Sequence, residues 1–204
     1  DPQPRPLIKP PPTARSQDVT GMQFTECGIA GAWVIEPTPH ADERGRFARV
    51  WCRQEFGSNA IEFTPVQANM GYSFTIGTIR GLHYQVAPAA EAKLVRCTRG
   101  SMFDVVVDLR PSSVTYCVWY GTTLSAENAR MLYLPEGWAH GCQSLEDDTE
   151  FHYMTSAVYA PAEVRGARYD DPAFGIQWPL PASSISDQDR SWPLLSSLKK
   201  EALR

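Results

Sequence analysis

The hydrophobic and polar positions along this chain follow a pattern that is typical of short β-strands. The clearest case covers residues 103–109, where Phe, Val, Val and Leu occupy every second position and Asp occupies two of the three between them. Because successive side chains of a strand point to opposite faces, this period of two predicts a strand. Further apolar, β-branched or aromatic runs cover residues 93–98, 115–124, 131–134, 141–144 and 149–156. Arg99 and Gly100 separate the first run from the alternating strand, which predicts a hairpin.

Helical patterns are short and few. We predict one helical turn near residues 125–128 and a terminal helical segment around residues 194–203. No longer helical pattern alternates with the strands, which argues against a parallel α/β sheet. Many short antiparallel strands in one chain predict an all-β fold, either a sandwich or a jelly roll.

The beginning of the chain differs in composition from the rest. Six of the 17 prolines lie between positions 2 and 12. Such a run favours extended polyproline conformations and cannot join the interior of a sheet. We therefore predict that residues 1–21 form a flexible, proline-rich tail and that residues 22–204 form a single domain. That length is enough to bury a sizeable core.

Charge and cysteine content narrow the class of protein. The formal net charge is −4, which gives no reason to expect a nucleic-acid partner. No apolar run is long enough to span a membrane, and no secretory signal pattern is present. The five cysteines are widely spaced and form no Cys-x-x-Cys pair, which favours reduced thiols and a cytoplasmic location. We expect Cys97 and Cys117 to belong to the core.

Chemistry-bearing side chains gather in residues 80–93. Arg80 and His83 belong to the sequence Arg-Gly-Leu-His-Tyr-Gln, and Lys93 follows ten residues after His83. We expect these three side chains on two neighbouring strands of a barrel. A histidine can remove a proton next to a carbonyl, while fixed cations hold an anionic substrate or the oxyanion that develops. The segment therefore predicts proton abstraction next to a carbonyl group.

A second motif raises the question of a metal site. Residues 135–140, Pro-Glu-Gly-Trp-Ala-His, fit the P-x-G-x-x-H pattern of the cupin jelly roll, which points His140 into the barrel. Metal-binding cupins add an H-x-H and a glutamate on an earlier strand. Here the earlier strand offers His83 alone, and Ala89 and Ala90 stand where the glutamate is expected. Because a first-row metal needs three or four ligands, we predict a metal-free acid–base cupin without a cofactor.

Several sequence blocks, taken in order, point to one known family. They are residues 42–45 (DERG), 80–85 (RGLHYQ), 93–97 (KLVRC), 103–108 (FDVVVD), 135–141 (PEGWAHG) and 178–180 (WPL). From about residue 24 to residue 195 the chain resembles dTDP-4-dehydrorhamnose 3,5-epimerases, the metal-free cupin epimerases of nucleotide-sugar biosynthesis. The resemblance implies a cupin jelly-roll barrel of antiparallel strands with a few short helices.

The family resemblance also implies a reaction. The substrate is a 4-keto-6-deoxyhexose linked to a nucleoside diphosphate, and its ketone acidifies the hydrogens at C3 and C5. A base removes one hydrogen to leave an enolate, and an acid on the opposite face returns a proton. The expected reaction is the inversion of C3, C5 or both, with dTDP-4-dehydro-6-deoxy-D-glucose giving dTDP-4-dehydro-L-rhamnose when both are inverted.

Roles for individual residues follow from the same resemblance. His83 matches the base, Asp189 its carboxylate partner and Tyr153 the proton donor, and Lys93 matches a lysine near the sugar oxygen. The residues that match substrate contacts are Arg44, Gln67, Asn69, Arg80, His140 and Tyr159. The two arginines suit a diphosphate, since guanidinium groups bind such oxygens in pairs.

Three positions differ from the family pattern. Arg49 and Val164 stand where the family commonly has acids, and Gln188 replaces a lysine. Charge changes near a nucleotide alter ligand preference, so another nucleotide or a modified sugar stays an alternative substrate. Two further alternatives are a ketoisomerase on a similar barrel and a non-catalytic cupin that binds sugar nucleotides. The resemblance also implies a homodimer with an exchanged N-terminal strand, in which Arg44 serves the partner's site.

Overall fold

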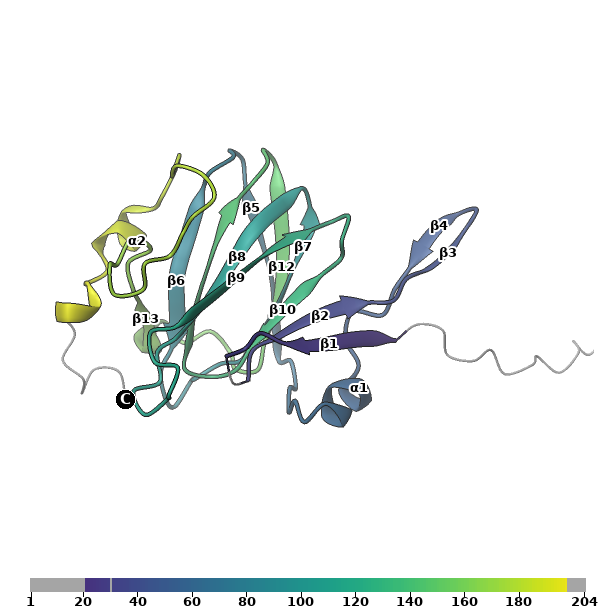
Figure 1. Cartoon of the computed structure of the whole chain (residues 1–204), viewed down its shortest axis with the longest axis horizontal. Helices are drawn as coiled ribbons and strands as arrows, with labels where there is room; N and C mark the ends of the chain where they lie inside the picture. Colours follow the sequence, from purple (N-terminus) through teal and green to yellow (C-terminus); the bar gives the residue numbers. More distant parts are fainter. Residues whose placement is uncertain (1–20, 30, 198–204) are drawn as a thin grey trace, which may run out of the picture.

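The computed structural model describes residues 21–29 and 31–197 (Figure 1). Nearly all of the predicted N-terminal tail, residues 1–20, lies outside the described residues, as do residues 198–203 of the predicted terminal helical segment. The division into a tail and one domain therefore stays a prediction.

Two antiparallel sheets face each other and enclose the barrel (Figure 1). One sheet has six strands, in the spatial order β1 (Met22–Glu26), β2 (Trp33–Pro37), β10 (Met131–Leu134), β7 (Lys93–Arg99), β12 (Thr149–Thr155) and β5 (Gln67–Ser73). The other has five, in the order β13 (Val164–Gly166), β6 (Ile79–Gln85), β11 (Trp138–Ser144), β8 (Ser101–Asp108) and β9 (Trp119–Ser125). This arrangement confirms the predicted all-β jelly roll.

The remaining elements are short. Strands β3 (His40–Asp42) and β4 (Gly45–Phe47) pair only with each other and form a hairpin that projects from the barrel (Figure 1). Helices α1 (Arg53–Ser58) and α2 (Asp187–Ser191) are accompanied by two 3₁₀ turns, Pro161–Glu163 and Leu195–Ser197. None of the described helices is long and apolar enough to cross a lipid bilayer.

Most strand predictions are confirmed, and three local predictions are wrong. The alternating segment is β8, and Gly100, at φ +70°, forms the turn from β7 into it. The predicted hairpin is wrong, because β7 and β8 belong to opposite sheets and the turn between them crosses the barrel. Residues 125–128 are a turn and not a helix, because Ser125 and Asn128 satisfy each other's backbone N–H groups with their side chains. The run at residues 115–124 contains a strand only from Trp119 onward, since Thr115 lies in a turn that bonds to Asp108.

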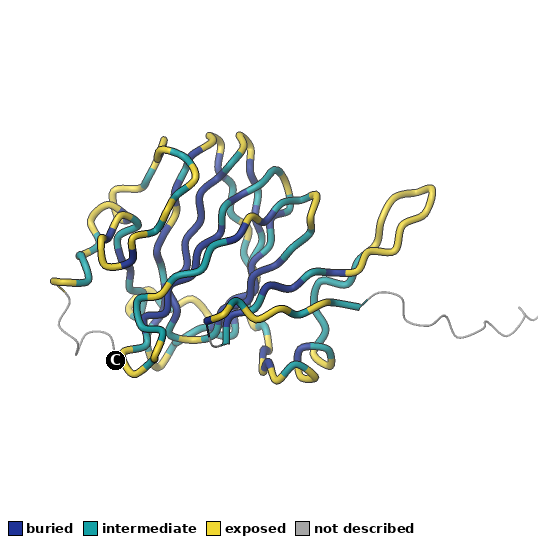
Figure 2. The backbone as a smooth tube through the Cα atoms, viewed as in Figure 1, coloured by how far each residue is buried: buried dark blue, intermediate teal, exposed yellow. Residues whose placement is uncertain are grey.

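The core has three buried clusters among the described residues, and two of them cover the two faces of the five-stranded sheet. Between the sheets, Val106 of β8 belongs to a buried cluster with Val95 and Leu132 of the opposite sheet. On the outer face, Val105 and Val107 pack against the C-terminal segment that contains Phe174. Figure 2 shows the buried residues concentrated in the strands of the barrel, whereas most loops and the β3–β4 hairpin are exposed. The sheet that carries much of the predicted chemistry is therefore held rigidly from both sides.

All five cysteines are free thiols in the structure. Cys97 is buried, as predicted, and burial raises the pKa of its thiol to about 11. Cys117 is only half-buried and lies at φ +66° outside any strand, although it packs against the outer core layer. The raised pKa makes Cys97 an unreactive packing residue at neutral pH.

Candidate active site

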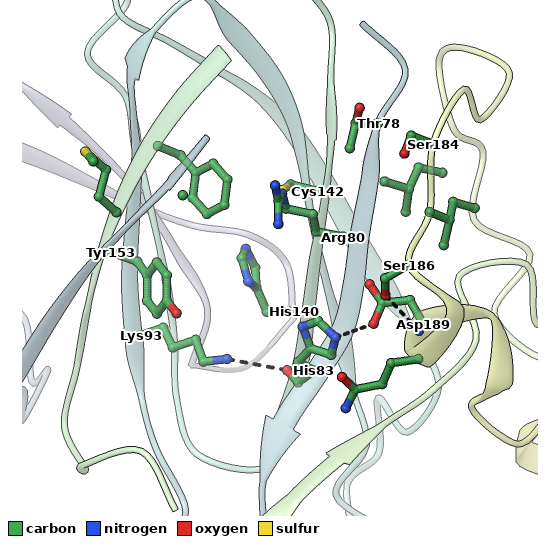
Figure 3. Close-up of a pocket in the computed structure, with 16 residues that line it drawn as sticks. Thr78, Arg80, His83, Lys93, His140, Cys142, Tyr153, Ser184, Ser186 and Asp189 are labelled. Atoms are coloured by element: carbon green, nitrogen blue, oxygen red, sulfur yellow. Dashed lines mark hydrogen bonds and ion pairs between the residues drawn. The ribbon is translucent and has the colours of Figure 1, made fainter. Parts of the chain in front are cut away.

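A cavity of about 570 Å³ lies between the two sheets, beside β5 and β6 (Figure 3). Its wall includes most of the residues expected to carry the chemistry, namely Arg80, His83, Lys93, His140, Tyr153 and Asp189. A second cavity of about 210 Å³ shares His83, Lys93 and Tyr153 with the first. These three residues therefore stand where the two cavities meet.

His83 and Asp189 form a close pair. Strand β6 carries His83, and its Nε2 lies 2.6 Å from Oδ1 of Asp189 in helix α2. The Asp189 side chain is 6% exposed and that of His83 37%. Ser186 caps α2 by accepting a hydrogen bond from the Asp189 N–H at 3.0 Å, which fixes the carboxylate at the start of the helix.

The surroundings of Asp189 keep it ionised. Burial alone would raise the pKa of Asp189, but hydrogen bonds from His83, the Gly81 N–H and the Trp192 indole outweigh that effect and hold it below the usual value. An ionised carboxylate accepts a hydrogen bond from the Nε2–H of a neutral imidazole, and Nδ1 of that tautomer carries no proton. The pair can therefore act as an oriented base.

Glycine at position 81 makes this contact possible. Gly81 has φ +112°, and a Cβ there would lie 2.6 Å from the His140 carbonyl oxygen and 2.7 Å from Gly141 Cα. Because only glycine tolerates both the conformation and the close approach, β6 and β11 can lie near enough to bring the two histidines side by side. Their Cα atoms are partners in the strand register.

His140 has a carboxylate partner of its own. Its Nε2 lies 2.7 Å from Oδ1 of Asp104, which is completely buried on the neighbouring strand β8. The other oxygen of Asp104 has no hydrogen-bond partner within the described residues. The two histidines thus turn toward separate carboxylates. In the part of the chain that the structure describes, no three His, Cys, Asp or Glu side chains gather into a group that could hold a metal ion.

Lys93 faces His83 across the cavity. The expectation that both lie on neighbouring strands is wrong, because β6 and β7 follow each other in the chain but belong to opposite sheets. The connection between them crosses the barrel, as jelly-roll topology requires, and brings Lys93 Nζ to 3.5 Å from the His83 carbonyl oxygen. Lys93 Nζ also lies 3.1 Å from Oε1 of Glu91, and the two side chains are only 7% and 10% exposed.

Tyr153 occupies the side of the cavity opposite the His83–Asp189 pair (Figure 3). Its ring stacks on Phe151 with ring centres 6.3 Å apart, and the Phe151 ring lies over Gly71, where any Cβ would clash. Burial raises the pKa of Tyr153, and the negative charge of Glu91 raises it further. The phenol therefore holds its proton at neutral pH and is able to act as an acid.

Most of the other residues predicted to contact the substrate line one of the two cavities, but not all of them do. Arg80 lies at the cavity wall and donates to the Tyr72 carbonyl oxygen at 2.6 Å. Gln67 bonds to Asn69 and accepts from the Tyr159 N–H, both at 3.0 Å. Asn69 and Tyr159 line the second cavity.

Arg44 lies outside this group. It is on the projecting β3–β4 hairpin, where its side chain is 84% exposed and pairs with Asp42. The described chain therefore does not bring Arg44 into its own cavity.

The three positions that depart from the family differ in location. Gln188 lines both cavities and Val164 the smaller one. Arg49 lines neither of them, and its guanidinium pairs with Glu55 of α1 at 2.7 Å. Two of the three changes therefore border the site.

Several residues of the site were not found by sequence reasoning. Asp104 was visible only as a polar position in the β8 alternation, and Glu91 as an acid two residues before Lys93. Trp192 follows Asp189 by three residues, the spacing of one helical turn, which is a signal that could have been used.

Comparison with known proteins agrees with this architecture. A profile described as dTDP-4-dehydrorhamnose 3,5-epimerase matches residues 26–197. A dTDP-4-dehydrorhamnose 3,5-epimerase of Sinorhizobium fredii is 43% identical over 178 residues, which cover 87% of this chain and 91% of the relative. A dTDP-4-dehydrorhamnose 3-epimerase of Streptomyces niveus is 38% identical, with 89% of this chain and 88% of the relative covered.

A solved structure extends the likeness to three dimensions. The dTDP-6-deoxy-D-glucose-3,5-epimerase of Legionella pneumophila, in complex with dTDP-4-keto-L-rhamnose, superimposes with a TM-score of 0.85 at 34% identity. The match covers 89% of this chain and 97% of that structure. The sequence blocks, the barrel and these matches agree, and the chain belongs to the dTDP-4-dehydrorhamnose 3,5-epimerase family.

Proposed function

We propose that this protein is a carbohydrate epimerase that inverts C3 and C5 of dTDP-4-dehydro-6-deoxy-D-glucose to give dTDP-4-dehydro-L-rhamnose. The observation that carries the proposal is the pairing of an oriented base, His83–Asp189, with a protonated phenol, Tyr153, on opposite sides of one cavity. Inversion needs that arrangement, because the proton must leave from one face of the sugar and return to the other.

The first step is proton removal by His83. Its unprotonated Nδ1 takes the hydrogen at C3 or C5, and the electrons of the broken C–H bond move onto the 4-keto oxygen to form an enolate. Asp189, 2.6 Å from Nε2, stabilises the imidazolium that results. The ketone of the substrate itself accepts the electron pair, so the proposed step needs no cofactor.

The second step is reprotonation from the opposite side. The Lys93 ammonium stabilises the enolate oxygen, since a fixed cation in a buried site interacts strongly with developing charge. Tyr153 then donates its proton to the carbon and inverts the centre. Solvent restores both groups by returning a proton to the tyrosinate and removing one from the imidazolium.

Substrate binding is divided between the two ends of the site. Arg80, at the wall of the larger cavity, contacts the diphosphate, and His140 contacts the sugar. Gln67 and Asn69 contact the nucleotide, and Tyr159 lines the sugar pocket, around the smaller cavity.

Arg44 reaches the site of a second copy in a homodimer with an exchanged N-terminal strand. The exposed hairpin supports this part of the proposal, because Phe47 is 69% exposed beside Arg44. Arg46 ties the hairpin to the β9–β10 turn through the Glu127 carbonyl oxygen at 2.7 Å, so the hairpin projects at a fixed angle. A cytoplasmic location also stays part of the proposal.

A mono-epimerase is the second candidate. The observation in its favour is the 3-epimerase of Streptomyces niveus, which matches the chain at 38% identity. The same base, acid and enolate serve both reactions, and they differ in whether one or two carbons present their hydrogens to His83. The changed residues Val164 and Gln188 border the cavities in which that choice is made.

Proton NMR in deuterium oxide tests the proposal. With dTDP-4-keto-6-deoxyglucose as substrate, loss of the C3 and C5 proton signals supports 3,5-epimerase chemistry. Loss of one signal alone identifies a mono-epimerase. Absence of any exchange by the folded protein contradicts the proposal for this nucleotide, and the same assay with other nucleoside diphosphates then tests the nucleotide alternatives.

A further inference from the structure

A carboxylate with little exposure stands beside the proposed catalytic groups and has no part in the scheme above. Glu91, just before β7, has a side chain that is 10% exposed, and its Oε1 lies 3.1 Å from Lys93 Nζ. It lines the smaller cavity together with His83 and Tyr153. A charge in this position acts on both of the groups proposed to handle the enolate and the returning proton.

The Glu91 carboxylate is held in one orientation. Its second oxygen, Oε2, accepts a hydrogen bond from Gln85 Nε2 at 3.2 Å. Gln85 is 2% exposed and also accepts from the Ala160 N–H at 2.6 Å, next to Tyr159. Because Gln85 is fixed by the backbone, Glu91 has little freedom to turn away from Lys93.

Lys93 needs such a partner. An ammonium group loses most of its hydration when its side chain is only 7% exposed, and that loss is unfavourable unless an opposite charge lies close. Nζ has three N–H donors. One N–H can donate to the Glu91 carboxylate and a second to the His83 carbonyl oxygen at 3.5 Å. The third N–H is then left to donate to an oxygen of the substrate.

We infer that Glu91 is a positioning residue that fixes the Lys93 ammonium between the base and the acid and sets the charge of the cavity during proton transfer. The inference rests on the proposed function, since it assigns Glu91 a role through Lys93 and Tyr153. Glu91 does not touch the reacting carbon and acts only through these two side chains.

The ionisation of Tyr153 is the measurable property that depends on the charge of Glu91. After burial, Glu91 is the largest influence that raises the pKa of Tyr153. Tyr159 and Cys142 also raise it, while Arg80 lowers it. The other titratable or charged groups that line the two cavities are His83, Tyr84, Lys93, His140 and Asp189. Removing the charge of Glu91 should therefore lower the pKa at which Tyr153 loses its proton.

The test compares Glu91→Gln with Glu91→Asp and with Glu62→Gln, an exposed acid that lines neither cavity. For Glu91→Gln we expect kcat for C3 and C5 exchange to fall about tenfold, and the alkaline limb of its pH profile to move down by about one pH unit. KM should change less than kcat. Glu91→Asp keeps the charge and should keep the wild-type alkaline limb, and Glu62→Gln should match the wild type in both rate and profile.

A spectroscopic titration provides a readout that does not depend on turnover. The tyrosinate absorbance of the protein, minus that of its Tyr153→Phe variant, reports the ionisation of Tyr153 alone. Repeating the subtraction in the Glu91→Gln background should give a lower midpoint. If Glu91→Gln does not fold, as judged by circular dichroism, the same titration with Glu91→Asp should give an unchanged midpoint, and a lowered midpoint there overturns the inference.

Two results overturn the role of Glu91 while the proposed function stands. One is a folded Glu91→Gln variant with the wild-type rate and alkaline limb. The other is a slower variant whose Tyr153 midpoint and alkaline limb are both unchanged, which means that Glu91 is merely structural. Absence of exchange in the wild type, with a Tyr153 midpoint that still responds to Glu91, overturns the proposed reaction and leaves only the electrostatic part of the inference.

Discussion

Two histidines on adjacent strands of the same sheet each pair with an aspartate, yet the surroundings of the two pairs differ. The His83–Asp189 and His140–Asp104 contacts are 2.6 and 2.7 Å long. The His83 side chain is 37% exposed to the cavity and that of His140 only 11%. Residue type and spacing therefore do not decide which histidine can reach a substrate hydrogen. Access to the ring decides it.

The two carboxylates differ as well. Asp189 comes from helix α2 at the edge of the barrel and accepts from His83, from the Gly81 N–H and from Trp192. Asp104 belongs to strand β8, is wholly buried and has one oxygen without a partner among the described residues. The first environment stabilises a carboxylate that supports an imidazolium. The second suits a histidine held as a fixed hydrogen-bonding group.

Replacing each histidine in turn should give the largest contrast. His83→Asn removes the base, and we expect the rate of C3 and C5 exchange to fall about 10³-fold. His140→Asn removes a proposed contact to the substrate, and we expect a loss of about tenfold, mainly in KM. The rates come from proton NMR in deuterium oxide. Equal losses in the two variants would remove the distinction between the pairs.

The carboxylates should give the next largest contrast. In Asp189→Asn the amide no longer fixes the His83 tautomer, so we expect kcat to fall on the order of 10²-fold while KM changes little. Asp104→Asn should affect KM more than kcat. Steady-state kinetics of both variants provide the measurement, and a larger kcat loss for Asp104→Asn contradicts the assignment.

The stability of the Asp189→Asn variant in acid provides a separate test of the role of Asp189. The pKa of Asp189 is lowered in the folded protein, so its ionised form favours folding above the usual aspartate pKa of about 3.9. That contribution is lost as the pH falls through the lowered folded-state pKa. Urea unfolding should therefore show a shallower loss of stability in acid for Asp189→Asn than for the wild type.

The smallest effect concerns Trp192. Its indole N–H donates to Asp189 Oδ1 at 3.3 Å, and its ring packs over Gly166 and edge-on to His83. Trp192→Phe removes one hydrogen bond to a charged group, and we expect kcat to fall about threefold to tenfold. Trp178→Phe is the matched control, since its indole bonds to the Tyr169 carbonyl oxygen instead. An equal loss in both variants would assign the effect of Trp192 to packing.

Much of the fold was predictable because its signals are local. The period of two in β8 and the glycine turn before it depend on neighbouring residues only, and both are found in the structure. The prediction of a helical turn at Ser125–Asn128 is wrong because the same polar residues are common at helix caps and in turns. The placement of Lys93 was wrong because no local signal tells whether the next strand pairs or crosses to the other sheet.

The site was predictable to a smaller extent. The family resemblance named His83, Tyr153 and Asp189, which the fold brings to one cavity from three separate elements. Asp104 and Glu91 were missed because their partners lie on other strands, and a contact between strands has no fixed sequence spacing. Arg44 was named, but a single chain does not bring it to the cavity.

The central claim is that His83 removes and Tyr153 returns the proton from opposite faces. Proton NMR of the Tyr153→Phe and His83→Asn variants in deuterium oxide tests it most directly. Without the acid, His83 can still remove the proton and return deuterium to the same face, so Tyr153→Phe should exchange without inversion. His83→Asn should neither exchange nor invert. Inversion by Tyr153→Phe at the wild-type rate, or exchange by His83→Asn, would contradict the account.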